Sequence, residues 1–128
     1  MWSNYYTPGM TNAFGRRVRR QRKALLLLGP ELGLRQVAVR IGIEPSYLSK
    51  IERGLMAPPS EDTIVRLAKA LALDPDELLA AAGKVSGDVR RAILQRPKLM
   101  AGLVRQFAKV SDAAVERVIL RARRSGRQ

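Results

Sequence analysis

The segment from Leu34 to Arg53 combines a fixed spacing of small and apolar residues with a row of hydrogen-bond donors. The spacing places Ala38, Gly42, Leu48 and Ile51 at offsets of 4, 8, 14 and 17 from Leu34. A small residue is needed where two short helices cross closely, and a glycine allows the left-handed backbone of a tight turn. The side chains left free on the second helix are Ser46, Tyr47, Ser49, Lys50 and Arg53. They can donate hydrogen bonds and attract anions, and they include no carboxylate for acid–base chemistry.

The 128-residue chain contains no cysteine and no histidine. It therefore cannot build a disulfide framework, a zinc site of thiolates or imidazoles, a Cys/His nucleophile pair or a Ser-His-Asp triad. Four acidic residues fall in the first turns of expected helices, where the helix dipole accounts for them: Glu61, Asp62, Asp76 and Glu77. We expect a protein that is not an enzyme and that needs no metal and no cofactor.

The net charge of +13 is distributed unevenly along the chain. Residues 1–30 carry six basic and no acidic side chains, residues 31–85 carry seven and eight, and residues 86–128 carry eleven and three. Two basic flanks predict a polyanionic partner, of which nucleic acid is the commonest. The balanced middle segment argues against a purely electrostatic binder. No apolar run is longer than that of residues 24–28, which is too short to span a bilayer, and no secretory signal is recognisable. We expect a cytoplasmic protein without a membrane partner.

The apolar residues recur at helical spacing, and nothing in the chain is typical of a strand. A first helix capped by Thr11 or Asn12 is expected to end at Gly29-Pro30, after an irregular N-terminal arm over residues 1–11. Further helices are expected to begin after Gly33, at Pro45, after Ser60, after Asp74, after Ser86, at Pro97 and after Ser111. The sequence predicts an all-α protein of two helical units joined near residues 83–87.

The string PSYLSKIERG at residues 45–54, followed by Pro58-Pro59-Ser60 and by LAKAL at residues 67–71, resembles the helix-turn-helix family of the phage Cro and lambda repressors, the XRE type. The resemblance implies a five-helix DNA-binding domain over residues 12–83. It implies that the third helix, residues 45–53, enters the major groove of double-stranded DNA, usually as a dimer on a two-fold symmetric operator. It also implies a structural ion pair between Arg22 and Glu52.

Two positions depart from the family pattern. Leu34 replaces the glutamine that often begins the second helix and contacts a phosphate, and Pro45 occupies the first base-reading position without a donor. Readout is therefore expected to move towards the side chains that follow. Extra residues around 26–32 predict a longer first helix or loop.

The chemistry of each side chain suggests its role on DNA. We expect base contacts from Ser46, Tyr47, Ser49 and Lys50, since a lysine can reach guanine O6 and N7 and hydroxyls can bond base edges. We expect phosphate contacts from Arg53, Arg35, Arg17 and Arg20. Ala38, Gly42, Leu48 and Ile51 are expected to form the core of the helix pair.

The C-terminal region, residues 87–124, has too many apolar residues for isolated helices to leave in water. Dimerisation or partner binding is therefore expected there, through Leu103, Phe107, Val115, Val118 and Ile119. Residues 125–128 form a basic tail. The region is too short and too helical for a self-cleaving peptidase domain.

The leading interpretation is a sequence-specific transcriptional regulator, a dimeric repressor that covers promoter elements. One alternative is the antitoxin of a toxin–antitoxin pair that regulates its own operon. A second is a sequence-tolerant architectural protein, for which mutation of Lys50 would weaken binding little and equally on all sequences. Besides DNA and a second copy, a toxin, a protease or another regulator is a possible protein partner.

Overall fold

The structure, a computed structural model, describes residues 8–126. Over these residues the chain forms eight α-helices and one 3-10 helix, without a strand, so the all-α prediction is confirmed. The chain divides into two compact units, residues 1–86 and 87–128. This division falls within the stretch where the composition changes.

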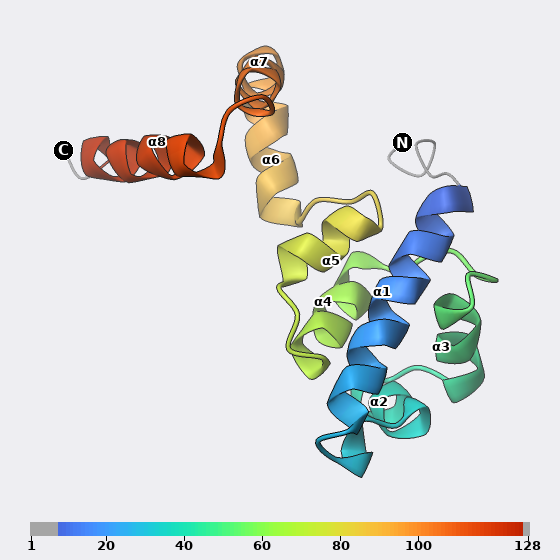
Figure 1. The fold of residues 1–128 in the computed structure, drawn as a ribbon. Helices are drawn as coiled ribbons and strands as arrows, with labels where there is room; N and C mark the ends of the chain where they lie inside the picture. Colours follow the sequence, from blue (N-terminus) through green and yellow to red (C-terminus); the bar gives the residue numbers. More distant parts are fainter. Residues whose placement is uncertain (1–7, 127–128) are drawn as a thin grey trace. The chain divides into compact units, whose positions relative to one another are not determined.

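The first unit contains five α-helices (Figure 1). They are α1 (Pro8–Leu26), α2 (Leu34–Ile41), α3 (Pro45–Glu52), α4 (Glu61–Ala70) and α5 (Pro75–Ala81), with the short 3-10 helix η2 (Pro30–Leu32) between α1 and α2. Helix α1 contacts both α3 and α5, and α2 contacts α3 and α4. The extra residues between the first two helices thus form a turn and η2.

Helix α1 begins at Pro8, so the expectation of an irregular arm is wrong for residues 8–11. A cap at Thr11 or Asn12 is also wrong. Proline suits the first position of a helix because its fixed φ is helical and the amide hydrogen it lacks would have no partner there. The remainder of the expected arm, residues 1–7, lies outside the described residues.

One hydrophobic core holds the first unit together. The fully or nearly fully buried apolar side chains of residues 12–126 all belong to this unit: Phe14, Val18, Val37, Ala38, Ile41, Leu48, Ile51, Ile64, Leu67, Ala68, Leu71, Leu78, Leu79 and Ala82. Two predicted caps are confirmed, because Ser60 Oγ accepts from the backbone of Thr63 (3.4 Å) and Asp74 Oδ1 accepts from that of Glu77 (3.1 Å). Such caps satisfy donors that the first turn of a helix leaves unpaired.

The second unit consists of α6 (Gly87–Gln95), α7 (Pro97–Phe107) and α8 (Asp112–Ser125). Ser111 caps α8 by accepting from the backbone of Ala114 at 3.2 Å, as predicted. None of the three helices contains a buried residue, and Leu99 and Leu94 are 69% and 65% exposed. This unit therefore lacks a core of its own over its described residues. No helix within residues 8–126 is both long enough and apolar enough to cross a bilayer.

Candidate nucleic-acid interface

The turn between α2 and α3 depends on Gly42. Its φ of +78° lies in the left-handed region, and its backbone N–H donates to the carbonyls of Ala38 and Val39. A Cβ at this position would meet no other atom within 4 Å, so the backbone conformation alone requires the glycine. Ala38, Leu48 and Ile51 around the turn are at most 1% exposed. The structure thus places all four spacing residues where two short helices cross.

Helix α3 separates a buried row from an exposed row. Leu48, Ile51 and Glu52 point into the domain. Ser46, Lys50 and Arg53 are exposed, and their spacing of i, i+4 and i+7 aligns them along the opposite side of the helix. This exposed row offers a hydroxyl and two cations to a ligand.

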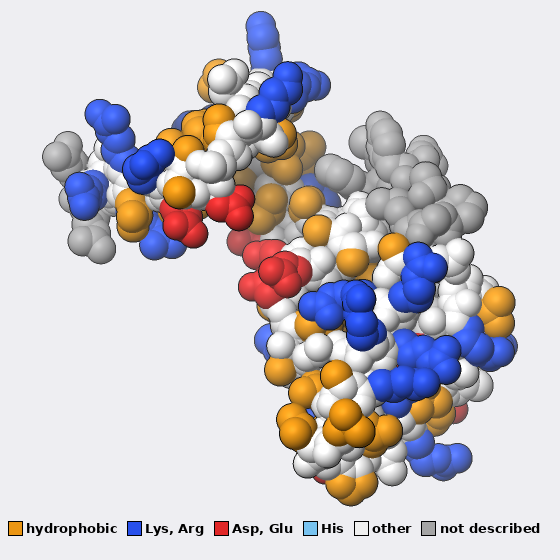
Figure 2. Space-filling view, in the orientation of Figure 1, with side chains coloured by type: hydrophobic (Ala, Val, Ile, Leu, Met, Phe, Trp, Pro, Cys, Tyr) orange, Lys and Arg blue, Asp and Glu red, His pale blue; other side chains and the backbone are white. Residues whose placement is uncertain are grey.

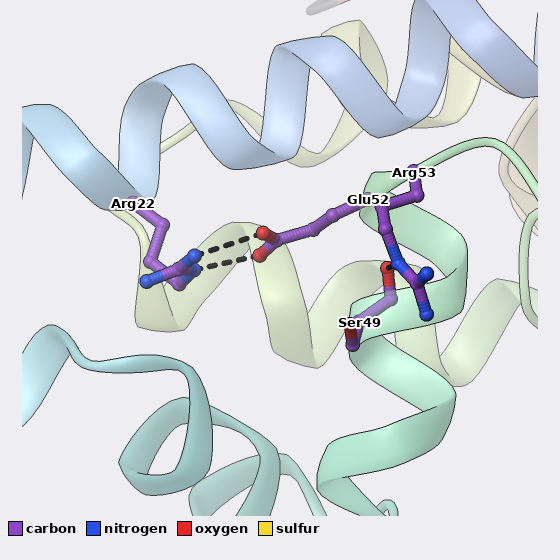
Figure 3. A network of polar contacts seen from close by, with 4 residues as sticks. All are labelled: Arg22, Ser49, Glu52 and Arg53. Carbon is purple, nitrogen blue, oxygen red and sulfur yellow. Dashed lines mark hydrogen bonds and ion pairs between the residues drawn. The ribbon is translucent and has the colours of Figure 1, made fainter.

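Two of the expected base-reading residues are less available. Tyr47 is half-buried and packs against the core, and Ser49 is half-buried. The backbone carbonyl of Ser49 accepts a hydrogen bond from Nε of Arg53 at 3.4 Å (Figure 3). The side chain of Arg53 therefore lies along the helix, towards the preceding turn.

A buried ion pair ties the end of α3 to α1. Arg22 donates from Nε to Glu52 Oε2 at 2.6 Å and from Nη2 to Oε1 at 2.8 Å (Figure 3). Both residues are under 10% exposed. The hydrogen bonds to Glu52 raise the pKa of Arg22, against a smaller opposing effect of burial. The pair fixes the rotation of α3, and with it the direction of the exposed row.

The role of Gly15 was not predicted from the sequence. A Cβ there would overlap the carbonyl oxygen of Ile51 and lie 2.8 Å from that of Glu52. Helix α1 therefore approaches the backbone of α3 at a point where only glycine fits. The sequence did offer one signal, a glycine inside an amphipathic helical pattern. A glycine disfavours a helix, so its presence there usually has a packing reason.

Two further polar contacts between helices of this unit were not predicted. Arg66 on α4 donates from Nε to the carbonyl of Ile41 at 3.1 Å, at the end of α2. Gln21 on α1 donates to the carbonyl of Leu71 at 2.8 Å, at the end of α4. Both long side chains satisfy carbonyls that helix ends leave without partners. Nothing in the sequence pattern identifies the distant carbonyl that each one reaches.

The family described as "Helix-turn-helix domain" matches residues 13–81, the five helices just described. The chain belongs to this helix-turn-helix family, in its XRE type. It is 38% identical over 72 residues to the uncharacterized HTH-type transcriptional regulator RghRB of Bacillus subtilis (strain 168), covering 56% of this chain and 48% of that protein. It is 39% identical over 67 residues to the uncharacterized HTH-type transcriptional regulator MT0491 of Mycobacterium tuberculosis (strain CDC 1551 / Oshkosh), covering 49% and 47%. The chain thus spans about half the length of these relatives.

Among solved structures, the chain is similar to one described as a SinR protein/SinI protein complex. The TM-score is 0.45 and the identity 20%, over 90% of this chain and 99% of that one.

Within the helix-turn-helix pair, the two departures from the family pattern have structural consequences. Leu34, the first residue of α2, is half-buried and packs against the core, so its side chain is not directed at a phosphate. Pro45 is the first residue of α3, where it favours helix initiation. Arg35, the second residue of α2, is exposed beside Leu34. A cation therefore stands next to the position at which the family often has glutamine.

Arg17 and Arg20 do not lie with the α3 exposed row. They are on α1, Arg17 half-buried and Arg20 exposed, whereas α1 faces α3 with Gly15 and Arg22. At about 100° per residue, both arginines lie roughly 140–160° around α1 from those two contacts. The expectation that Arg17 and Arg20 contact DNA phosphates therefore stays a prediction, on a side of α1 other than the one that faces α3.

Proposed function

We propose that this protein binds specific sites in double-stranded DNA and regulates transcription, with α3 as the helix that reads bases in the major groove. The observation that carries the proposal is the exposed row Ser46, Lys50 and Arg53, backed by the buried Leu48 and Ile51. A helix of this kind can enter the major groove because its inner face is held rigidly by the core and its outer face carries only donors and cations.

The individual roles follow from position on α3. In this proposal Lys50, at the middle of the exposed row, donates to O6 and N7 of guanine, and Ser46 bonds a base edge near the start of the helix. Tyr47 and Ser49, being half-buried, contribute contacts from the margin of the row. Arg53, at the end of the helix, is suited to a phosphate, as is Arg35 on α2.

We further propose that the protein acts as a dimeric repressor on a two-fold symmetric operator. A single domain offers one short row of base-reading groups, and two copies on one operator double it. The exposed apolar side chains of α7 and α8 support pairing, with Leu103, Val118 and Ile119 about half exposed. A dimer bound across a promoter would exclude polymerase.

The same surface favours a second candidate, an antitoxin-like regulator in which α6–α8 bind another protein. A stable partner that co-purifies from the native cell, encoded beside this gene, would support that function. A second copy as the sole partner would contradict it.

The proposed function is tested by selecting and sequencing genomic fragments bound by the purified protein at about 0.15 M salt, since non-specific binding falls steeply with salt. Lys50→Ala is compared with Lys69→Ala, an exposed lysine on α4 that lies outside the row. We expect a short inverted repeat that Lys50→Ala removes and Lys69→Ala keeps. Broad enrichment without a motif, unchanged by Lys50→Ala, would overturn the proposal in favour of an architectural protein.

A further inference from the structure

Helix α1 carries a cluster of cations that the ion pair with Glu52 does not use. Arg16, Arg17, Arg19, Arg20 and Lys23 lie within eight residues and line an open depression on the surface together with Ala13. Lysine and arginine side chains accordingly gather over this helix in Figure 2. No aspartate or glutamate occurs in residues 1–30, so no acidic side chain of α1 offsets this charge.

The contacts of α1 fix which way each cation points. Phe14 and Val18 enter the core, and Gly15 and Arg22 face α3. Taking about 100° per residue, the cations form two rows. The near row contains Arg16, Arg19 and Lys23 and borders the side that faces α3. The far row contains Arg17 and Arg20 and lies on the opposite side of the helix.

The far row of α1 and the exposed row of α3 point in different directions. Glu52 marks the side of α3 that faces α1. Ser46, Lys50 and Arg53 lie roughly 100–160° around α3 from Glu52, so they point away from α1. The axes of packed helices are about 8–10 Å apart. The far row projects from the side of α1 that is turned away from α3. A duplex held by the exposed row of α3 therefore lies on the side of that helix that is turned away from α1.

The far row has the chemistry of a phosphate-binding surface. Guanidinium groups bind phosphate oxygens in a two-pronged geometry that ammonium groups cannot match. Cations three or four residues apart on a helix repel one another, as Arg17 and Arg20 do, so the free protein carries a repulsion that bound phosphates relieve. Ala13 and Ala24 continue the far row on either side and leave it unobstructed by long side chains.

We propose that Arg17 and Arg20 bind the backbone of a second DNA duplex, on the side of α1 opposite α3, so that one domain holds two duplex segments together. This surface is distinct from the base-reading row and carries no sequence preference, because phosphates are the same in every sequence. It would allow the protein to bridge a specific site and a distant segment.

A bridging assay with the full chain tests this proposal. A short duplex is immobilised, the protein is bound to it, and capture of a second, fluorescent duplex is measured. Arg17→Gln/Arg20→Gln is compared with Arg19→Gln/Lys23→Gln, which removes the same charge from the near row. We expect the far-row variant to capture at least tenfold less second duplex while its affinity for a single duplex changes less than threefold. The near-row variant is expected to keep bridging.

Three results would overturn the proposal. Wild-type protein that binds one duplex but captures no second one would do so and would leave the proposed function intact. If the far-row variant still bridges two duplexes, the bridging would be assigned to the two α3 helices of a dimer. A far-row variant that no longer binds vesicles of phosphatidylserine and phosphatidylcholine, but still bridges DNA, would identify a membrane surface as the ligand of Arg17 and Arg20. Circular dichroism checks folding, and Arg20→Gln alone, at an exposed position, serves if the double variant is unfolded.

Discussion

Arg22 and Glu52 form a two-pronged ion pair inside the helix-turn-helix domain, with N···O distances of 2.6 and 2.8 Å. The pair joins the C-terminal part of α1 to the last residue of α3. Its side chains are only 8% and 3% exposed, so neither charge has water as an alternative partner. The orientation of α3, the helix that we propose reads DNA, therefore depends on two residues that need touch no DNA.

Removing one partner of this pair is expected to be costly. Glu52→Ala leaves the guanidinium of Arg22 buried without an anion, and such a change typically lowers the free energy of unfolding by about 3–5 kcal/mol. Urea denaturation followed by circular dichroism measures it. The double variant Arg22→Met/Glu52→Leu should recover most of the loss, because apolar residues of similar volume replace the charges. A loss below about 1 kcal/mol for Glu52→Ala would contradict the buried pair.

Two glycines of the domain are expected to differ in their tolerance of alanine. Gly15→Ala places a Cβ against two carbonyl oxygens of α3, which as backbone atoms cannot move aside independently. Gly42→Ala meets no atom within 4 Å and suffers only from its φ of +78°, a cost of about 1–2 kcal/mol.

We expect Gly15→Ala to destabilise the protein more than Gly42→Ala does, and also to weaken DNA binding by shifting α3. Thermal unfolding and DNA titration of both variants check this order. The reverse order of stabilities would mean that α1 and α3 are not in close contact at Gly15.

The ends of helices in this domain could be predicted from the sequence where a residue at the end itself determines the boundary. Gly42 and Pro45 mark the end of one helix and the start of the next, and Ser60 and Asp74 cap helices through their own side chains. The start of α1 was predicted wrongly because Pro8 and Gly9, which usually break helices, are tolerated in a first turn.

The remaining features depend on contacts between distant residues. The need for Gly15 comes from a carbonyl of Ile51, 36 positions away in the sequence. The direction of Arg17 and Arg20 comes from the rotation of α1, which the core and the Arg22–Glu52 pair fix together. Six cations on one helix predict a polyanionic partner, but the sequence alone does not indicate which of them share a side of the helix.

Phosphate contacts and base contacts should separate in a salt titration. For each phosphate contact removed, the slope of log K against log salt concentration falls by about 0.9 without a change in sequence preference. We expect this result for Arg35→Gln and for Arg53→Gln, measured by fluorescence anisotropy on operator and unrelated duplexes. Lys50→Ala should instead reduce the difference between the two duplexes. An unchanged slope for Arg35→Gln would remove that residue from the interface.

The apolar surface of the second unit should control the oligomeric state. Leu103 on α7 and Val118 on α8 are 51% and 41% exposed, and neither has a core within its unit to pack into. If these residues pair two copies, Leu103→Glu/Val118→Glu introduces charges that water would solvate only in the monomer. Sedimentation velocity at micromolar concentration should then give a dimer for the wild type and a monomer for this variant.

The control for that experiment is Leu55→Glu, since Leu55 is 63% exposed in the first unit. This variant should remain a dimer, because Leu55 lies outside the α6–α8 surface. Dissociation by both variants would indicate a general effect of added negative charge. A wild type that sediments as a monomer would contradict dimerisation and direct attention to a different protein partner for α6–α8. Loss of cooperative operator binding in the Leu103→Glu/Val118→Glu variant, with the affinity for a half-site retained, would link the pairing to DNA recognition.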